Sequence, residues 1–273
     1  MKLIRPGQAS LKELLANNSG LAIGRILQVA GTPLQRLLDR AGGTHRFCNV
    51  QGIITLKNDG FRQYADILKR NFEQLTSGTY WADRGWRNAS HHYNPFTNRG
   101  LWRWPSAVTE CRRHLARSLD AWRAGRQDQS FFWLGAALHI VQDSCVPHHA
   151  RAIITHGHQR YETWADSHKS DYAASGEGMY GLGEDPGKWV KSNALIAYSM
   201  YPKVSDGSCE SDYRAASKVL LLRAQRTTAG FMAMFFELVD LISKADSHEG
   251  SDEGNENEVE GSLEVPLPTP AGL

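Results

Sequence analysis

The sequence predicts an all-α protein built around one multi-helix domain. Apolar residues recur at the three- and four-residue spacing of helices through most of residues 41–244. No segment shows the alternation of apolar and polar residues that a half-buried strand requires. The chain has 273 residues, of which 41% are hydrophobic, so it is long enough to bury a sizeable core. We therefore expect a single all-helical domain over residues 41–244.

The expected helices follow one another along this domain. They cover about 44–75 with a break at Gly60, then about 106–124, 128–146, 158–170, 188–200 and 210–243. A long connection over residues 77–105 is rich in Gly, Asn, Pro and aromatic residues. Its tryptophans argue against disorder, and long ordered loops are usually functional.

The two ends of the chain differ in composition from the domain. Residues 1–40 are expected to form an N-terminal helical extension or pro-segment of short amphipathic pieces. The start is basic, but Arg25 interrupts its best apolar run, so we expect no standard signal peptide. No stretch is expected to span a membrane. Residues 245–273 are acidic and rich in Gly, Ser and Pro, which predicts a disordered tail.

Charge and cysteine content narrow the function classes. The net charge of +2 gives no broad electrostatic footprint for nucleic acid, so we expect no stable nucleic-acid partner. The four cysteines (Cys48, Cys111, Cys145 and Cys209) lie far apart and contain no C-x-x-C pair. This spacing excludes a zinc knuckle and a dense disulfide framework, but it leaves one or two bridges open.

Histidines and carboxylates are concentrated in one stretch behind an apolar run. His139 and Asp143 are four residues apart, so on a helix they share one face. His158 and Glu162 repeat this spacing, and a proline between the pairs predicts a helix break just before His149. One such pair is usually a surface or capping interaction, but two pairs that enter a core need partners. The spacing therefore predicts ligands for more than one zinc ion.

Three further ligand candidates lie upstream. His45 opens the first core helix, and Asp83 and His91 lie in the long connection. Taken singly, each has an ordinary alternative role, and Asp83 in particular is a common loop-turn residue. Their significance depends on a pattern that covers the whole domain.

That pattern resembles the bacterial zinc-dependent phospholipase C family, which is related more distantly to the single-strand-specific zinc nucleases. The matching segments, in family order, are Thr44-His45, G-x-Y-x-A-D at 78–83, A-S-H-x-Y-x-P at 89–95, H-x3-D-x3-P-x-H at 139–149, H-x3-E at 158–162 and A-Q-R-x-T-A-G at 224–230. Each match is weak alone, but together they span nearly all of the helical domain.

The resemblance implies an all-helical fold with a cluster of zinc ions. It groups the ligands as His91, His139 and Asp143 with Asp83 beside them, then His149, His158 and Glu162, and finally His45, with Asp143 bridging. His92, His148 and His156 lie one or two positions off the pattern, so we expect them behind the ligands or on the surface.

One departure from the family affects the third zinc site. In the family, the mature chain begins with a tryptophan whose amino group and carbonyl complete that site. The corresponding region here is near residues 31–33, no tryptophan precedes Trp81, and the chain extends upstream. We therefore expect either two or three zinc ions per chain.

The resemblance also implies an activity. A zinc-activated water would attack a phospholipid at a membrane surface and release diacylglycerol and a phosphorylated headgroup. Asp83 is the expected general base, because the family carries a carboxylate near the attacking water at this position. Tyr80, Trp81, Tyr93 and Arg84 are the expected substrate-binding residues. The aromatic members of this set have an alternative role as core filling.

The headgroup preference is expected to differ from that of choline-preferring relatives. Those relatives carry aromatic residues where Arg84 and Asn88 stand here. Aromatic faces suit a quaternary ammonium, whereas an arginine favours an anionic group. Secretion is what the resemblance implies for localisation.

Two alternatives to a phospholipase C stay open. One is a single-strand nuclease or nucleotide phosphatase on the same zinc cluster. Against it, the nuclease relatives usually carry aspartate where Glu162 stands, and they have a longer insertion between the ligands that match His149 and His158. The other is a non-enzymatic zinc-stabilised module, but structural zinc sites are usually closed and rich in cysteine.

Overall fold

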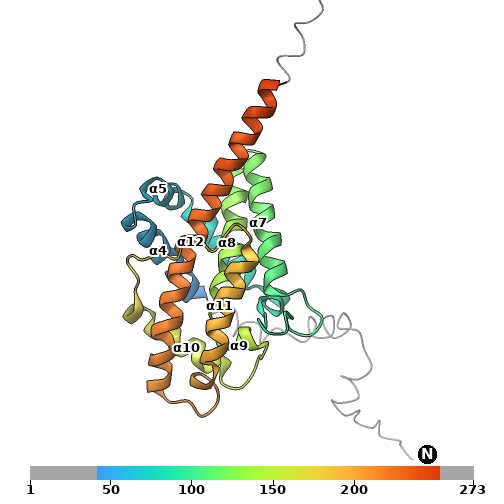
Figure 1. Ribbon diagram of the computed structural model, residues 1–273. Coiled ribbons are helices and arrows are strands. Elements are labelled where there is room, and N and C mark those ends of the chain that lie inside the picture. Colours follow the sequence, from blue (N-terminus) through green and yellow to red (C-terminus); the bar gives the residue numbers. More distant parts are fainter. Residues whose placement is uncertain (1–41, 253–273) are drawn as a thin grey trace, which may run out of the picture.

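Helices form throughout residues 42–252, which are the residues that the computed structural model describes (Figure 1). The expected extension over residues 1–40 and the tail beyond residue 252 lie outside the described residues. Within 42–252 there is no β-strand, and the only extended pairing is an isolated bridge between Asn94 and Arg99. The predicted all-α single domain is confirmed.

The elements follow the expected order. They are α4 (Gly42–Asn58), α5 (Arg62–Arg70), α6 (Phe72–Ala82), η1 (Gly85–His91), α7 (Ala107–Arg123), α8 (Gln127–Asp143), α9 (Pro147–Arg151), α10 (His158–His168), η2 (Lys169–Tyr172), α11 (Pro186–Met200), η3 (Tyr201–Lys203) and α12 (Glu210–Asp252). The long helix α12 runs beside α4, α8 and α11, while α6 and α7 pack on α8 (Figure 1).

Helix α8 lies at the centre of the core. From Leu134 to Asp143 every residue of this helix is buried, as expected of a helix segment that is enclosed on all sides. Phe131 of α8 contacts Phe235 of α12 edge to face, with ring centroids 6.1 Å apart. Burial of each such side chain contributes about 1.5–3 kcal/mol. The helix that carries His139 and Asp143 is therefore held on every side.

Helices α6 and α8 touch backbone to backbone through two glycines. A Cβ atom on Gly78 would lie 1.8 Å from the Phe132 carbonyl oxygen, and one on Gly135 would lie 1.9 Å from the Leu75 carbonyl oxygen. No side chain fits at either position, because real Cβ contacts are never this short. This close crossing brings Asp83, at the end of α6, near the ligand face of α8.

Two boundaries differ from those expected. The connection expected from residue 77 begins later, because α6 continues to Ala82 and residues 85–91 form η1. Gly78, which lies in the expected connection, is a point of contact between α6 and α8 rather than part of a loop. Helix α12 continues to Asp252, past the expected domain end at 244, and no proline interrupts it there. The break predicted at Pro147 is present, since this residue is the first of α9.

The four cysteines are all free, so neither of the bridges that the sequence left open forms in this structure. Cys48, Cys111 and Cys145 are buried, and Cys209 is exposed. No helix among the described residues has both the length and the apolar character needed to cross a bilayer.

Candidate metal centre

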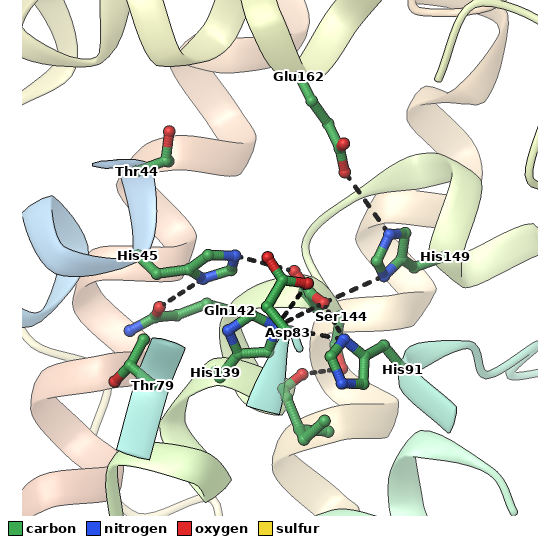
Figure 2. Close-up of polar contacts among 12 residues, drawn as sticks. Thr44, His45, Thr79, Asp83, His91, His139, Gln142, Ser144, His149 and Glu162 are labelled. Carbon is green, nitrogen blue, oxygen red and sulfur yellow. Dashed lines mark hydrogen bonds and ion pairs between the residues drawn. The ribbon is translucent and has the colours of Figure 1, made fainter. Parts of the chain in front are cut away.

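The eight expected ligands come from six elements and converge on one region. Figure 2 labels six of them, which are His45, Asp83, His91, His139, His149 and Glu162. They are His45 on α4, Asp83 at the end of α6, His91 on η1, His139 and Asp143 on α8, His149 on α9, and His158 and Glu162 on α10. The start of α4 is tied to α10, because the Thr44 hydroxyl donates to Asp166 at 2.7 Å.

The carboxylate of Asp143 lies at the centre of this region. Its Oδ1 is 3.2 Å from His45 Nε2. Its Oδ2 is 2.7 Å from His91 Nδ1, 3.1 Å from His139 Nε2 and 3.4 Å from His149 Nδ1. Four imidazoles therefore point at one buried carboxylate.

The donor atoms form three groups, each compact enough to hold a metal ion. The groups are His45, His139 and Asp143, then Asp83, His91 and His139, and then His149, His158 and Glu162. His139 belongs to two of them, and its Nε2 lies 3.8 Å from Asp83 Oδ1 and 3.2 Å from His91 Nδ1. None of these three groups, drawn from the part of the chain that the structure describes, includes a cysteine.

The third group is held by a tight turn between α9 and α10. Glu162 Oε1 lies 2.8 Å from His158 Nε2 and 3.5 Å from His149 Nε2. Gly157 precedes α10 with φ of 89°, a conformation that glycine adopts without strain. This turn places His158 one residue after the glycine, opposite His149.

A buried amide network that the sequence patterns did not single out fixes the orientation of His45. Gln142 Oε1 lies 2.9 Å from His45 Nδ1. The Nε2 atom of Gln142 donates to Asn49 at 2.8 Å and to the Thr228 hydroxyl at 3.0 Å. Because the amide oxygen can only accept, His45 carries a proton on Nδ1, and Nε2 is the ring nitrogen that faces Asp143. Thr228 lies in the A-Q-R-x-T-A-G segment, which was the available signal for this network.

The three off-pattern histidines divide as expected between the region behind the ligands and the surface. His92 is buried and stacks on His149 with ring centroids 4.6 Å apart, and His148 is buried and stacks on His158 at 4.7 Å. His156 is 64% exposed at its side chain. The two buried rings therefore support the ligands of the third group from behind.

Burial and opposite charge shift the titration of the central groups. Burial alone would raise the pKa of Asp143, but His139, His149 and His45 outweigh it and hold that pKa well below its usual range. Burial lowers the pKa of His45, yet Asp143 outweighs this and raises it to about 9. Burial lowers the pKa of His139 to about 4. His139 is therefore neutral near pH 7 and offers a lone pair to a cation.

This donor set fits zinc. It offers imidazole nitrogens and carboxylate oxygens, which zinc binds in open sites. The buried Nδ1 atom of His149 makes no hydrogen bond within the described residues, and it lies 3.4 Å from Asp143 Oδ2. His91 Nδ1 and His139 Nε2, at 3.2 Å, face each other across the same space. A divalent cation could bind the lone pairs of these ring nitrogens together, whereas the imidazoles and the one carboxylate cannot satisfy them all.

The expected substrate-binding residues have different positions. Trp81 and Arg84 line a cavity that extends from His91. Tyr80 is partly exposed. Tyr93 is buried, and its hydroxyl donates to Asn98 at 2.6 Å, so a substrate contact at this residue stays a prediction. Burial of the motif tyrosine follows from its packing against the end of α9, where its N–H donates to the His149 carbonyl.

The site lies within the part of the chain that matches a known protein family. The model of a family described as zinc dependent phospholipase C matches residues 44–211, a range that contains all eight candidate ligands. A phospholipase C from Clostridium perfringens is 28% identical over 256 residues, covering 80% of this chain and 63% of that protein. A phospholipase C from Listeria monocytogenes serovar 1/2a is 28% identical over 193 residues, covering 60% of this chain and 66% of that protein.

Solved structures agree at the level of the fold. The alpha toxin from Clostridium absonum superposes with a TM-score of 0.64 at 21% identity, covering 71% of this chain and 63% of that chain. The alpha toxin from an avian strain of Clostridium perfringens gives a TM-score of 0.60 at 24% identity, covering 71% and 62%. This chain thus spans less than two thirds of the length of these relatives.

Proposed function

Because this chain belongs to the zinc-dependent phospholipase C family, we propose that it hydrolyses phospholipids at a membrane surface to diacylglycerol and a phosphorylated headgroup. The observation that carries the proposal is the position of Asp143, whose buried carboxylate lies within 3.4 Å of ring nitrogens from four histidines. Such a site suits a cluster of cations beside a bound phosphate.

The three groups of donors would hold up to three zinc ions. Asp143 would bridge two of them, since histidines of different groups face its two oxygens. Zinc held by such donors acts as a Lewis acid toward phosphate oxygens and makes water acidic enough to attack near neutral pH. Gln142 keeps the proton of His45 on Nδ1, so that Nε2 is the atom offered to the metal.

Asp83 supplies the general base in this proposal. Its side chain is 20% exposed, more than Asp143, and its Oδ1 lies 3.8 Å from His139 Nε2. This position lets Asp83 accept a proton from a water that attacks phosphorus. The bond from phosphorus to the glycerol oxygen then breaks, and that oxygen leaves with a proton as diacylglycerol.

The test is a product assay on zinc-loaded protein with phospholipid in mixed micelles. We expect diacylglycerol, identified by chromatography, and a fall in kcat of at least about 100-fold for Asp83→Asn. The matched control is Asp120→Asn, an exposed carboxylate on α7. Release of phosphatidic acid, or turnover of single-stranded DNA without turnover of any phospholipid, would contradict the proposal.

A further inference from the structure

A cavity of about 680 Å³ extends from His91 between the end of α6, η1 and α7. Most of the charged side chains that line it are positive. Four arginines line it (Arg84, Arg87, Arg113 and Arg117), together with a single carboxylate, that of Glu110. We refer to it as the arginine–tryptophan cavity, because Trp81, Trp86 and Trp104 form much of its wall.

Only one of the four arginines has its charge balanced within the described residues. Arg113 pairs with Glu110 at 2.6 Å. Arg87 donates to the Arg84 carbonyl at 2.7 Å, and Arg117 lies over the Trp133 ring at 4.6 Å, but neither contacts a carboxylate among residues 42–252. Arg84 has no acidic partner there either. Three guanidinium groups therefore offer charge and free donors around one cavity.

A buried histidine of the lining also lacks a partner. His114 is 95% buried, and its Nδ1 makes no hydrogen bond within the described residues. Its Nε2 is 3.8 Å from Glu110, which is beyond hydrogen-bond distance. A buried polar atom without a partner carries a desolvation cost. This cost is recovered if a polar ligand enters the cavity.

The cavity adjoins the candidate metal centre. His91 lines it, and His91 Nδ1 lies 2.7 Å from Asp143 Oδ2. Arg84 follows Asp83 directly in the chain, and Figure 2 shows Asp83 and His91 close together beside His139. His91 is therefore the residue that the cavity and the candidate metal centre share.

We propose that the arginine–tryptophan cavity binds a phospholipid headgroup that carries its own phosphate or carboxylate, and so selects such lipids as substrates. This inference rests on the proposed function. Guanidinium groups form charge-assisted, often bidentate hydrogen bonds with both groups. The three unbalanced guanidiniums supply these donors.

A choline headgroup fits the same cavity poorly. Cation–π binding needs open aromatic faces, but the Trp81 face is already covered by Arg87 at 4.2 Å. A quaternary ammonium would also lie beside the unbalanced positive charges of Arg84 and Arg117, which repel it.

The test compares two lipids that differ by one phosphate, phosphatidylinositol 4-phosphate and phosphatidylinositol, in mixed micelles of equal surface charge. We expect kcat/KM to be at least about tenfold higher for the former. Arg84→Gln and Arg117→Gln should each lower this ratio about three- to tenfold. Arg123→Gln, an exposed arginine at the end of the same helix α7, is the matched control. A wild-type ratio near one, or a ratio that neither substitution lowers, would overturn the proposal.

A binding measurement separates this proposal from the proposed function. Titration calorimetry with inositol 1,4-bisphosphate and inositol 1-phosphate needs no turnover. Tighter binding of the bisphosphate than of the monophosphate, with the difference reduced in Arg117→Gln, would support the cavity proposal. If no lipid were hydrolysed in the product assay, that result would end the proposed function but not the cavity proposal. Equal binding of inorganic phosphate, or tighter binding of a single-stranded oligonucleotide than of both inositol phosphates, would overturn the cavity proposal.

Discussion

Asp143 and Glu162 are both carboxylates among histidines, yet they lie in different surroundings. The Asp143 side chain is 5% exposed and faces four histidines from α4, η1, α8 and α9. The Glu162 side chain is 28% exposed and faces two, His149 and His158. The histidines around Asp143 are carried largely by long helices that pack against one another, and those around Glu162 by short α9 and the turn that follows it.

The difference shows two ways of fixing a ligand. Around Asp143, positions are set by helix packing, including the glycine contact between α6 and α8. Around Glu162, they are set by backbone turns, with left-handed φ values of 54° at Ala152, 58° at His156 and 89° at Gly157. We therefore expect packing changes to disturb the ligands around Asp143 and turn changes to disturb the third group.

The largest expected effect comes from Gly78→Ala. Its Cβ would meet the Phe132 carbonyl, so α6 must move away from α8, at a cost of about 3 kcal/mol in the free energy of unfolding. Asp83 and His139 then separate, while the third group is unchanged. Urea unfolding measures the cost, and Ser77→Ala, exposed on the same helix, is the control. Equal stability of both variants would contradict the packing account.

Gln142→Leu tests the amide network at the first group. The substitution leaves groups on His45, Asn49 and Thr228 without partners, so we expect a loss of about 2 kcal/mol in stability. Zinc affinity should fall at least about tenfold for one ion only, because His45 is no longer oriented. Thermal unfolding and competitive chelator titration measure the two effects, with the exposed Gln63→Leu as control. Unchanged zinc affinity would show that the network is purely structural.

Ala152→Gly should act in the opposite direction at the third group, which contains His149, His158 and Glu162. Ala152 ends α9 in the left-handed conformation, with φ of 54°. Glycine adopts this conformation without the steric cost, so we expect the protein to be about 0.5–1 kcal/mol more stable. Ala150→Gly, inside α9, should be destabilising instead. If chemical denaturation gives the same sign for both variants, the turn is not strained.

The smallest expected effect concerns the far end of α4, the helix that carries His45. Burial raises the pKa of Asp59, but hydrogen bonds from the Gly178 N–H, the Tyr180 hydroxyl and the Glu177 N–H outweigh it and lower that pKa. A lowered folded-state pKa stabilises the fold above pH about 4 and loses this contribution as the pH falls through the folded value. In Asp59→Asn the free energy of unfolding should therefore fall less at acidic pH than it does in the wild type. Asp66→Asn should behave like the wild type. Parallel curves for Asp59→Asn and the wild type would contradict this.

Much of this architecture follows from local sequence signals. Helical periodicity predicts α7, α8, α10, α11 and most of α12, because their apolar faces are dictated by burial. The i, i+4 pairs of His139 with Asp143 and His158 with Glu162 could be recognised because a helix brings residues of that spacing together.

The remaining features depend on contacts between distant segments. From the sequence, Gly78 resembles a loop residue, and the structure shows that α8 packs directly against it. Gln142 has no spacing that marks it, since its partners come from α4 and α12. The arginine–tryptophan cavity brings together α6, η1 and α7, and no pattern within one of these segments predicts it.

The central claim is that Asp143 serves more than one metal position and Glu162 serves only one. Zinc per chain, measured by elemental analysis on the wild type, Asp143→Asn and Glu162→Gln, tests it directly. We expect two to three zinc ions in the wild type, a loss of more than one in Asp143→Asn and a loss of about one in Glu162→Gln. Equal losses in the two variants, or a zinc-free wild type prepared without chelators, would contradict the account.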